Sequence, residues 1–350
     1  MARGGPTGRR ESGTPAAAGS EGGGVVKTTV IGAYPKVGDD AAAQELRRAL
    51  HRHDRGEIAD GDLDAAYDAT TRAALKEIED AGVDVTNDGQ IRWDDPLAPF
   101  ARAWGGVSRG PLERFYDNNT YFRQPVIKGP IRADGLTLVK DFAFARAAVT
   151  RAELKGAVCG PLTFATLAED RHFPSLEKRV LAVADAVAAE IRGLKDAGAT
   201  LVDVEDPALV ALPAHIELAR EAYGRIAGAG VAICLVTYFF PPDRILESLA
   251  SFRVAQIALD VRSRETTALG RLDAFPKTTT IVLGAVDARN TRLETPDEVA
   301  RLAEGALRLV SPDRLWLAPT TSLEYLPRDV ARAKLAALVA GAKSAGGVEA

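Results

Sequence analysis

The sequence predicts a single (β/α)8 TIM barrel, and three observations support this prediction. The chain has 350 residues, 46% of them hydrophobic, which is enough for one large core. Short apolar runs alternate with longer stretches of helical periodicity, about eight times along the chain, and this alternation is typical of a parallel sheet. The first unit lacks a GxGxxG motif, which disfavours a dinucleotide-binding fold.

The predicted strands are short continuous apolar runs, as expected where both faces of a sheet are covered. The first is VVKTTVIGAYP at residues 25–35, and VDVTNDG follows at 83–89. The later runs are LKGAVCG (154–160), LVDVE (201–205), VAICLVTYF (231–239), QIALDV (256–261), TTTIVLGAV (278–286) and RLWLAP (314–319). Two junctions, IEDAGVDVTNDG and LKDAGATLVDVEDP, repeat one order of helix end, glycine, strand and polar loop.

Helices are predicted between most of these strands, at residues 63–81, 175–197, 296–309 and 328–340 among others. The helix at 175–197 has the clearest pattern, because its apolar residues recur at spacings of three and four and so share one face. Ser175 is a suitable N-cap for it. Gly82 is placed to end the helix at 63–81.

The ends of the chain and one insertion depart from this pattern. Residues 1–24 are rich in Gly, Ser, Pro and Ala and are predicted to be a disordered tail, so the barrel is expected at 25–345. An insertion at 93–131, rich in aromatic residues, Arg and Asn, is expected to lie as a long loop over the active face.

Composition excludes several classes of protein. The net charge of -4, with Lys and Arg spread along the chain, argues against binding to nucleic acid or to a membrane surface. The two cysteines form no CxxC pair, so a disulfide framework or structural zinc module is not expected. No apolar run reaches the ~18 residues that span a bilayer, and the N-terminus lacks the apolar centre of a signal peptide. A cytoplasmic location is therefore expected.

Polar side chains follow almost every predicted strand. Because a barrel of this class builds its active site where the strands end, these residues are expected to meet at one mouth and to hold a small molecule. The candidate residues are Gly32, Ala33, Tyr34, Gln90, Arg92, Glu205, Asp206, Tyr238, Asp260, Asp287, Arg289, Asn290 and Thr321.

The stretch LVDVEDPAL is a buried strand that ends in three carboxylates. Asp203 and Glu205 alternate and should share a face, where Asp203 could form an ion pair with a neighbouring Lys or Arg. Asp206 and Asp287 each have a structural alternative, because a carboxylate just after a strand is often a helix N-cap. Crowding by Asp203 and Asp206 would raise the pKa of Glu205 and suit it to general-base chemistry.

Six motifs in order resemble the C-terminal catalytic barrel of cobalamin-independent methionine synthase and its short single-domain relatives. They are TTVIGAYP, the DG after the second strand, CGPLTF, VDVEDPAL, VDARNTRLET and WLAPTTSLEYLP. The resemblance covers nearly all of residues 28–340. It implies a (β/α)8 barrel that moves a methyl group from a methylated folate, or in some short relatives a methylcorrinoid, to the thiol of homocysteine.

The resemblance also implies roles for single residues. Glu205 and Asp206 match the acidic pair that holds the amino group of homocysteine, and Gln90 stands where the family has a glutamate. Ile31-Gly32-Ala33 matches a segment whose backbone holds the carboxylate, with Ala33 in place of a serine. Arg289 matches the histidine that acts as acid.

The family binds zinc through His, Cys, Glu and Cys, at positions that match Val236, Tyr238, Asp260 and Thr321. Three of these four ligands are replaced, so zinc is not expected and no metal ligand is assigned. A rebuilt site from Cys159, Cys234 and Asp260 is the alternative, since zinc needs three or four N, S or O ligands.

Three functions remain open from the sequence. The first is a methyltransferase of the methionine synthase type, with a methylated folate or methylcorrinoid as donor. The second is a zinc-free barrel that acts as a lyase or transferase on a small carboxylated or amino-acid-like substrate. The third is a non-catalytic ligand-binding barrel. A homodimer or a corrinoid protein is the candidate protein partner.

In the catalytic interpretations, four residues carry the chemistry and the rest bind substrate. Arg289, Asp287, Tyr238 and Asp260 are the candidate catalytic residues, with Tyr238 as a proton donor and Arg289 stabilising a thiolate. Arg92 and Arg289 are expected to bind carboxylates, because an arginine fork matches that group in bidentate fashion. Tyr34, Asn290 and Thr321 are expected to supply neutral hydrogen bonds.

Overall fold

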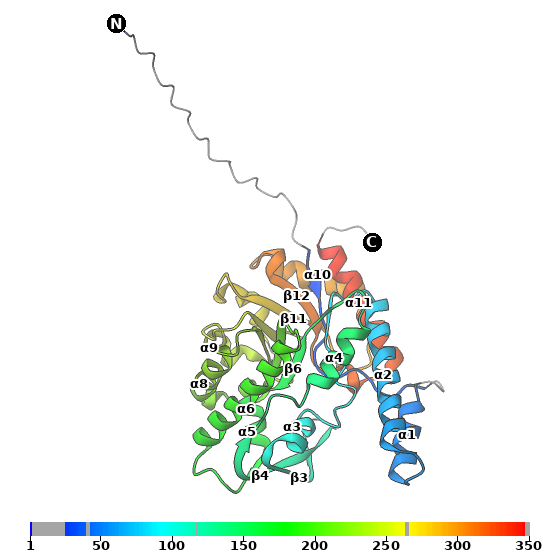
Figure 1. The fold of residues 1–350 in the computed structure, drawn as a ribbon. Helices are drawn as coiled ribbons and strands as arrows, with labels where there is room; N and C mark the ends of the chain where they lie inside the picture. The colour runs from blue at the N-terminus through cyan, green and yellow to red at the C-terminus, as the bar shows by residue number, and fades with distance from the viewer. Residues whose placement is uncertain (2–24, 40–42, 117, 119, 263–265, 347–350) are drawn as a thin grey trace.

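The structure is a computed structural model that describes Met1 and residues 25–39, 43–116, 118, 120–262 and 266–346 (Figure 1). The predicted tail at 1–24 lies almost wholly outside the described residues. No helix in the described part of the chain is long and apolar enough to cross a membrane.

The strands form a closed parallel barrel. Seven of them pair in the order β1-β12-β11-β10-β9-β8-β6. Thr29 then bridges to Val85 of β2, β2 pairs with β5, and Lys155 joins β5 to β6, which completes the ring. The bounds are β1 Lys27–Thr28, β2 Val85–Thr86, β5 Glu153–Leu154, β6 Gly156–Cys159, β8 Leu201–Glu205, β9 Ala232–Val236, β10 Gln256–Asp260, β11 Thr280–Val286 and β12 Leu315–Pro319.

This arrangement confirms the predicted (β/α)8 barrel, and the apolar runs explain it. Every residue of β8 and β10 is buried, because one face packs inside the barrel and the other packs against helices. The parallel register places Glu205 beside Val236 and Asp203 beside Cys234. The carboxyl ends of β8 and β9 therefore bring polar and apolar side chains to the same level of the barrel mouth.

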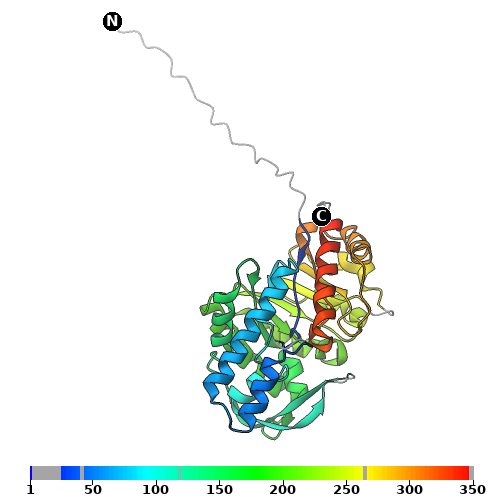
Figure 2. The ribbon, with the colours of Figure 1, turned by 90° about the vertical axis from the view of Figure 1, so that its right-hand side faces the viewer.

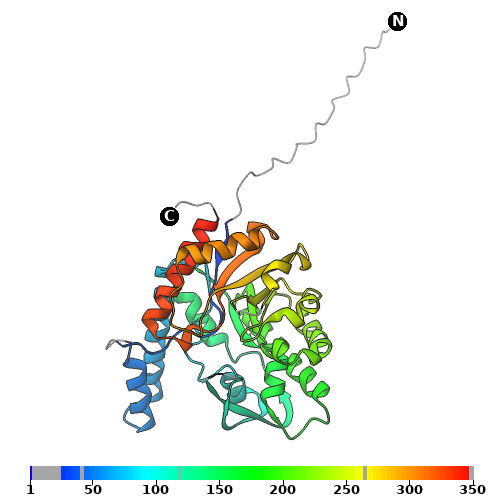
Figure 3. The same ribbon diagram turned by 180° about the vertical axis from the view of Figure 1, so that it is seen from behind.

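The predicted helices are confirmed with small shifts at their ends. They are α2 (Asp60–Asp80), α6 (Leu176–Asp196), α10 (Pro296–Leu307) and α11 (Arg328–Ala345). Ser175 caps α6, since its hydroxyl accepts a hydrogen bond from the Lys178 amide at 3.2 Å. Gly82 follows α2 with φ +85°, a conformation that favours glycine. Helices α10 and α11 pack together beside β11 and β12 (Figure 3).

Further helices complete the outer layer. The longer ones are α1 (Glu45–Asp54), α4 (Val139–Ala148), α5 (Pro161–Leu167) and α8 (Ile216–Ala227). The short ones are α3 (Ala98–Ala103), α7 (Ala208–Ala211), α9 (Leu246–Leu249) and the 3-10 turns η1 (Pro213–His215), η2 (Pro242–Arg244), η3 (Ala268–Ala274), η4 (Pro312–Arg314) and η5 (Leu323–Tyr325). Helices α1 and α2 lie side by side on one flank (Figure 2).

The insertion at 93–131 has regular structure where the sequence predicted a loop. It contains α3 and an antiparallel hairpin, β3 (Gly105–Arg114) and β4 (Tyr121–Arg132), which β7 (Glu169–Asp170) extends. The hairpin lies at the end of the barrel opposite the start of β1 and the C-terminal end of α11 (Figure 1). Phe115, which follows β3, and Phe122 of β4 are buried with their ring centroids 5.9 Å apart, and this contact favours the pairing of the two strands.

Candidate active site

The floor of the barrel mouth is a buried carboxyl held by two neutral groups. Glu205 ends β8 and is 4% exposed. The Gln90 side-chain amide donates a hydrogen bond to Glu205 Oε1 at 2.6 Å, and the Tyr238 hydroxyl lies 3.3 Å from Oε2. Gln90 follows β2 and Tyr238 follows β9, so the ends of three strands converge here, as the sequence predicted.

The environment of Glu205 suits it to proton exchange near neutral pH. Burial raises the pKa of Glu205 to about 7, and the nearby Asp203 carboxylate adds to that rise. The hydrogen bonds from Gln90 and Tyr238 oppose it, because they favour the ionised form. Glu205 can therefore ionise when a cation arrives, or act as a general base.

Asp203 lies one pleat deeper on the same strand and is paired. Lys155 Nζ is 2.6 Å from Asp203 Oδ2, and both side chains are almost fully buried, at 2% and 0% exposure. The ion pair expected for Asp203 is confirmed. It occupies the barrel interior directly below Glu205.

Asp206 points away from Glu205, toward helix α5. Its carboxylate accepts hydrogen bonds from the Thr163 amide at 2.7 Å and the Thr163 hydroxyl at 2.6 Å. Burial raises the pKa of Asp206 to about 6, although the donors of Thr163 and Leu162 oppose this. Asp206 thus holds the first turn of α5, a capping role like the one considered from the sequence. The structure does not bring it to the floor.

The first-strand segment meets the loop after β12. Gly32 has φ +66°, and a Cβ atom there would lie 2.1 Å from Ser322 Oγ. The Ala33 amide donates to Ser322 Oγ at 3.0 Å, and the Gly32 carbonyl accepts from the Asn87 side chain at 2.9 Å. The Ala33 amide, one of the backbone donors predicted to hold a ligand carboxylate, is therefore engaged within the protein.

Two predicted binding residues lie away from the mouth. Tyr34 donates a hydrogen bond from its hydroxyl to Glu77 Oε2 at 2.9 Å, on the side of helix α2. Arg92 forms ion pairs with Asp64 and Asp68, each at 2.7 Å, and with Asp141 at 3.3 Å. Arg92 therefore joins helices α2 and α4. Both side chains follow a strand, but the loop backbone turns them outward.

A cleft of about 620 Å³ opens above the floor. Its described lining residues are Asp94, Asn118, Thr120, Tyr121, Phe239, Arg289, Glu324 and Tyr325. The Arg289 guanidinium lies over the Phe239 ring, 5.4 Å from its centroid, and donates to the Phe239 carbonyl at 3.3 Å. Phe239 also packs against Tyr238 with ring centroids 4.7 Å apart. These rings connect the cleft to the floor that holds Glu205.

Backbone strain is concentrated around this site. Among the described residues other than glycine, positive φ occurs at Gln90 (49°), Tyr116 (53°) and Phe239 (74°). Such angles are unfavourable for bulky residues and persist only where the surrounding structure fixes them. Gln90 bonds Glu205, and Tyr116 packs against Phe239 with centroids 6.1 Å apart. The strained residues therefore belong to the floor and to the wall above it.

The other predicted residues have mainly supporting contacts. Asp287 accepts a hydrogen bond from the Arg289 amide at 2.8 Å and another from the Asn290 side chain, so it shapes the loop that carries Arg289. Asp260 is buried and accepts from the Arg262 amide at 3.0 Å. Thr321 is fully buried, and its hydroxyl lacks a hydrogen-bond partner among the described residues.

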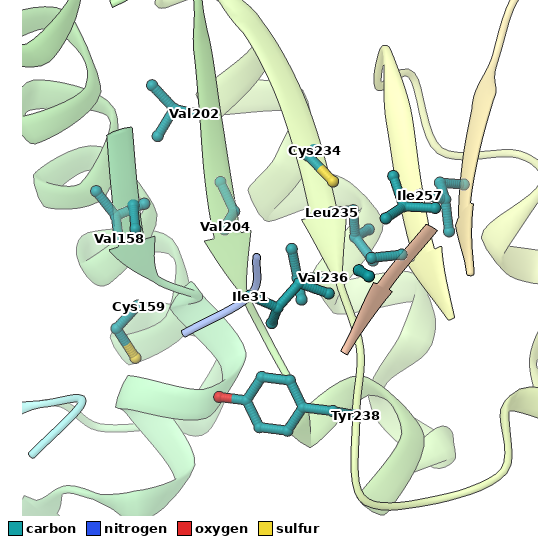
Figure 4. Packing of buried hydrophobic residues seen from close by; sticks show 14 of the residues in the cluster. Ile31, Val158, Cys159, Val202, Val204, Cys234, Leu235, Val236, Tyr238 and Ile257 are labelled. Atoms are coloured by element: carbon teal, nitrogen blue, oxygen red, sulfur yellow. The ribbon is translucent and has the colours of Figure 1, made fainter. Parts of the chain in front are cut away.

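The donor set at the four positions that the resemblance assigns to zinc does not fit zinc. Val236 has no donor atom, and it packs beside Ile31 in the barrel (Figure 4). Tyr238 is held beside Glu205, with its hydroxyl 3.3 Å from Oε2, and a phenol is not among the usual protein ligands of zinc. Asp260 and Thr321 leave one carboxylate and one neutral hydroxyl, fewer than the three N, S or O ligands that zinc requires.

The alternative site from Cys159, Cys234 and Asp260 is not formed either. Cys234 lies beside Asp203, whereas Cys159 lies beside Glu205. Among the described residues no group of three or more His, Cys, Asp or Glu side chains could hold a metal ion.

Sequence reasoning missed several parts of the site. Lys155 was inside the predicted strand LKGAVCG, and a lysine within an apolar run was a usable signal for a buried ion pair. Phe239 directly follows Tyr238, and an aromatic pair after a strand signals a wall of the mouth. Tyr325 and Ser322 had weaker signals, because they follow their strand at greater distance.

Comparison with known proteins identifies the family. A family model described as cobalamin-independent synthase, catalytic domain, matches residues 26–344. A methionine synthase of Sulfurisphaera tokodaii is 30% identical over 321 residues, which is 91% of this chain and 92% of the relative.

Solved structures share the fold. A B12-independent methionine synthase from a Shewanella species, in complex with selenomethionine, matches with TM-score 0.78 and 20% identity over 91% of this chain and 97% of that one. A putative vitamin-B12 independent methionine synthase from Listeria monocytogenes matches with TM-score 0.72 and 17% identity over 91% and 98%. The family model and the Sulfurisphaera relative both cover nearly the whole barrel, and the chain therefore belongs to the family of cobalamin-independent methionine synthase catalytic domains.

Proposed function

We propose that this enzyme transfers a methyl group to the thiol of a small amino acid, with homocysteine as the candidate acceptor and a methylated folate as the candidate donor. The family is one of methyltransferases, which gives the reaction class. The choice of an amino acid as acceptor is supported by the buried Glu205, which Gln90 and Tyr238 hold where three strands end.

The acceptor's α-ammonium would bind at Glu205. A cation near a carboxylate favours its ionised form, so binding would lower the pKa of Glu205 from about 7 and release the proton. Gln90 would keep its hydrogen bond to Oε1 of Glu205, because a neutral amide donor and an ammonium can both bind one carboxylate without repelling each other. Tyr238 would orient Oε2. A neutral ligand of the same shape would gain none of this charge attraction.

The cleft would hold the donor. Its volume of about 620 Å³ is within the range of pockets for drug-sized ligands. The rings of Phe239, Tyr121 and Tyr325 offer surfaces on which a planar heterocycle stacks, and Arg289 offers a guanidinium for a carboxylate. A folate has both features, whereas a corrinoid ring system is much larger than this cleft.

The transfer can be written so that atoms balance. The acceptor sulfur attacks the methyl carbon, the carbon–nitrogen bond of the donor breaks with its electron pair left on nitrogen, and the thiol proton ends on that nitrogen. The guanidinium of Arg289 can stabilise negative charge that develops on the donor.

The test is product formation from L-homocysteine and a methylated folate, followed by mass spectrometry. We expect methionine from the wild-type protein and a loss of at least about tenfold in Glu205→Gln, because the neutral amide cannot attract an ammonium. Glu190→Gln is the matched control. Glu190 is also fully buried, but it bonds Trp104 and Thr137 far along α6 from the mouth. Equal activity of wild type and Glu205→Gln would contradict the assignment.

A second function is favoured by the donor set at the zinc positions. Val236 and Thr321 stand where the family binds the metal that activates the thiol, and they do not fit it. A zinc-free transferase or lyase acting on a small amino-acid-like substrate would use the same floor. In that case amino acids would bind in a Glu205-dependent manner, but homocysteine and methylated folate would yield no methionine with or without added zinc.

A further inference from the structure

The barrel interior below Glu205 contains two opposite charges with no access to water. Lys155 joins β5 to β6, and Asp203 lies on β8, so the pair crosses between neighbouring strands. Their charged atoms are 2.6 Å apart, and the side chains are 2% and 0% exposed. A buried ion pair is weak evidence for stability, because its desolvation often offsets its attraction. The position of the Lys155–Asp203 pair, directly below Glu205, therefore suggests a role other than stability.

The pair is close enough to affect Glu205. Asp203 and Glu205 alternate on one strand, which places their Cα atoms roughly 6.5 Å apart on the same face. The carboxylate of Asp203 raises the pKa of Glu205, and the ammonium of Lys155 lowers it. The two influences oppose each other because the two charges have opposite signs, and the influence of Asp203 is the larger.

Other groups that face Glu205 are neutral at physiological pH. Burial raises the pKa values of the neighbouring thiols and phenols, which keeps them protonated. These groups come from β6, from β9, from the turn after β9 and from η5, and they are Cys159, Cys234, Tyr238 and Tyr325. Asp203 and Lys155 are the charged groups with the main influence on the pKa of Glu205.

We propose that Lys155 and Asp203 are a positioning pair for Glu205, in which the ammonium of one balances the carboxylate of the other, so that the ligand-binding charge of the floor is that of Glu205 alone. A lone Asp203 would keep Glu205 protonated and unable to attract a cation. A lone Lys155 would hold Glu205 ionised as its own partner and would compete with the ligand. The balanced pair leaves the site open to a single ammonium.

The test follows the titration of Glu205 in the ligand-free protein by NMR of 13C-labelled glutamate carboxyls, with the signal assigned through its loss in Glu205→Gln. We expect Asp203→Asn to move the midpoint to lower pH by roughly one to two units, because the like charge is gone and Lys155 remains. Adding Lys155→Met to this variant should return the midpoint to within about half a unit of wild type.

Two results would overturn the proposal: an unchanged midpoint in Asp203→Asn, or a midpoint in the double variant that stays as low as in the single one. If Asp203→Asn does not fold, the double variant decides, since a midpoint displaced from wild type by about a unit or more contradicts balance. The control is Glu190→Gln, which removes a fully buried carboxylate of α6 that accepts hydrogen bonds from Trp104 and Thr137 and, among the described residues, none from the floor. It should leave the midpoint unchanged.

The proposal rests on the proposed function only for its ligand, and binding of L-methionine and L-homocysteine separates the two. If the NMR midpoints of Glu205 shift as expected but no amino acid binds at any pH, the proposed function is contradicted and the positioning pair is supported. Glu205-dependent binding together with an unmoved midpoint in Asp203→Asn would do the reverse. In the expected case, Asp203→Asn shifts the acid limb of the binding profile by the same amount as the NMR midpoint.

Discussion

Binding of an amino acid should strengthen as pH rises through the pKa of Glu205. The perturbation is a change of pH across about 7. This is the pKa of Glu205, which is raised mainly by burial and further by the nearby Asp203 carboxylate. Only the ionised carboxyl attracts an ammonium. One unit below the pKa about a tenth of the sites are ionised, so the apparent Kd should be about tenfold higher there than its limit at high pH.

The same shift has a counterpart in stability. The pKa of Glu205 rises from its ordinary value of 4.5 to about 7, which corresponds to about 3 kcal/mol as an order of magnitude, because each pKa unit is about 1.4 kcal/mol. The folded-state pKa is raised, so this contribution is fully present below the unfolded value near 4.5. It is lost as pH rises through about 7. An ammonium ligand should offset much of this loss, and ligand stabilisation should therefore grow with pH.

The assay is isothermal titration calorimetry with L-methionine or L-homocysteine from about pH 5.5 to 8.5, in two buffers of different ionisation enthalpy. Near pH 6 we expect close to one proton released per ligand bound, falling toward none above about pH 8. Glu190→Gln should keep this profile. A flat affinity in wild type, or the wild-type profile in Glu205→Gln, would refute the reasoning.

Three further predictions concern other residues. Asp206→Ala should lower the free energy of unfolding by about 1–3 kcal/mol, because it leaves the Thr163 donors of α5 unpaired. Its affinity for amino acids should stay that of wild type. Denaturant titration measures the stability and calorimetry the affinity, and a variant of normal stability that has lost affinity would contradict this prediction. Arg289→Ala should reduce methyl transfer at least about tenfold without unfolding the protein, and a wild-type rate in single-turnover measurements would remove Arg289 from the site. Dialysis against a chelator should change neither the melting temperature nor methionine affinity, since the four family positions do not fit zinc; a fall in either that zinc restores would show a metal site.

Much of the fold could be predicted because its signals are local. The apolar runs, the glycine after α2 and the Ser175 cap of α6 each appear within a few residues of sequence, and the structure confirms the elements they predict. The hairpin of the insertion could not be predicted as well. Its pairing depends on Phe115 and Phe122 packing under it, which is a tertiary contact.

The site was predicted in part, and the errors have a physical cause. Glu205 and Asp206 are adjacent, and adjacent residues of a strand face opposite sides, so one lies at the floor and the other at α5. Tyr34 and Arg92 lie in loops, where the period of the strand no longer fixes direction. The pairing of Lys155 with Asp203 depended on the register between β6 and β8, which no single segment encodes.

The central claim is that the ends of β2, β8 and β9 form one receptor for the ammonium group of a small amino acid. Its most direct test is a crystal structure with L-homocysteine or L-methionine bound. The account predicts the ligand nitrogen within hydrogen-bond distance of the Glu205 carboxylate, with Gln90 still bonded to the other oxygen. Electron density that places the amino acid elsewhere, with Glu205 still enclosed by protein alone, would contradict it.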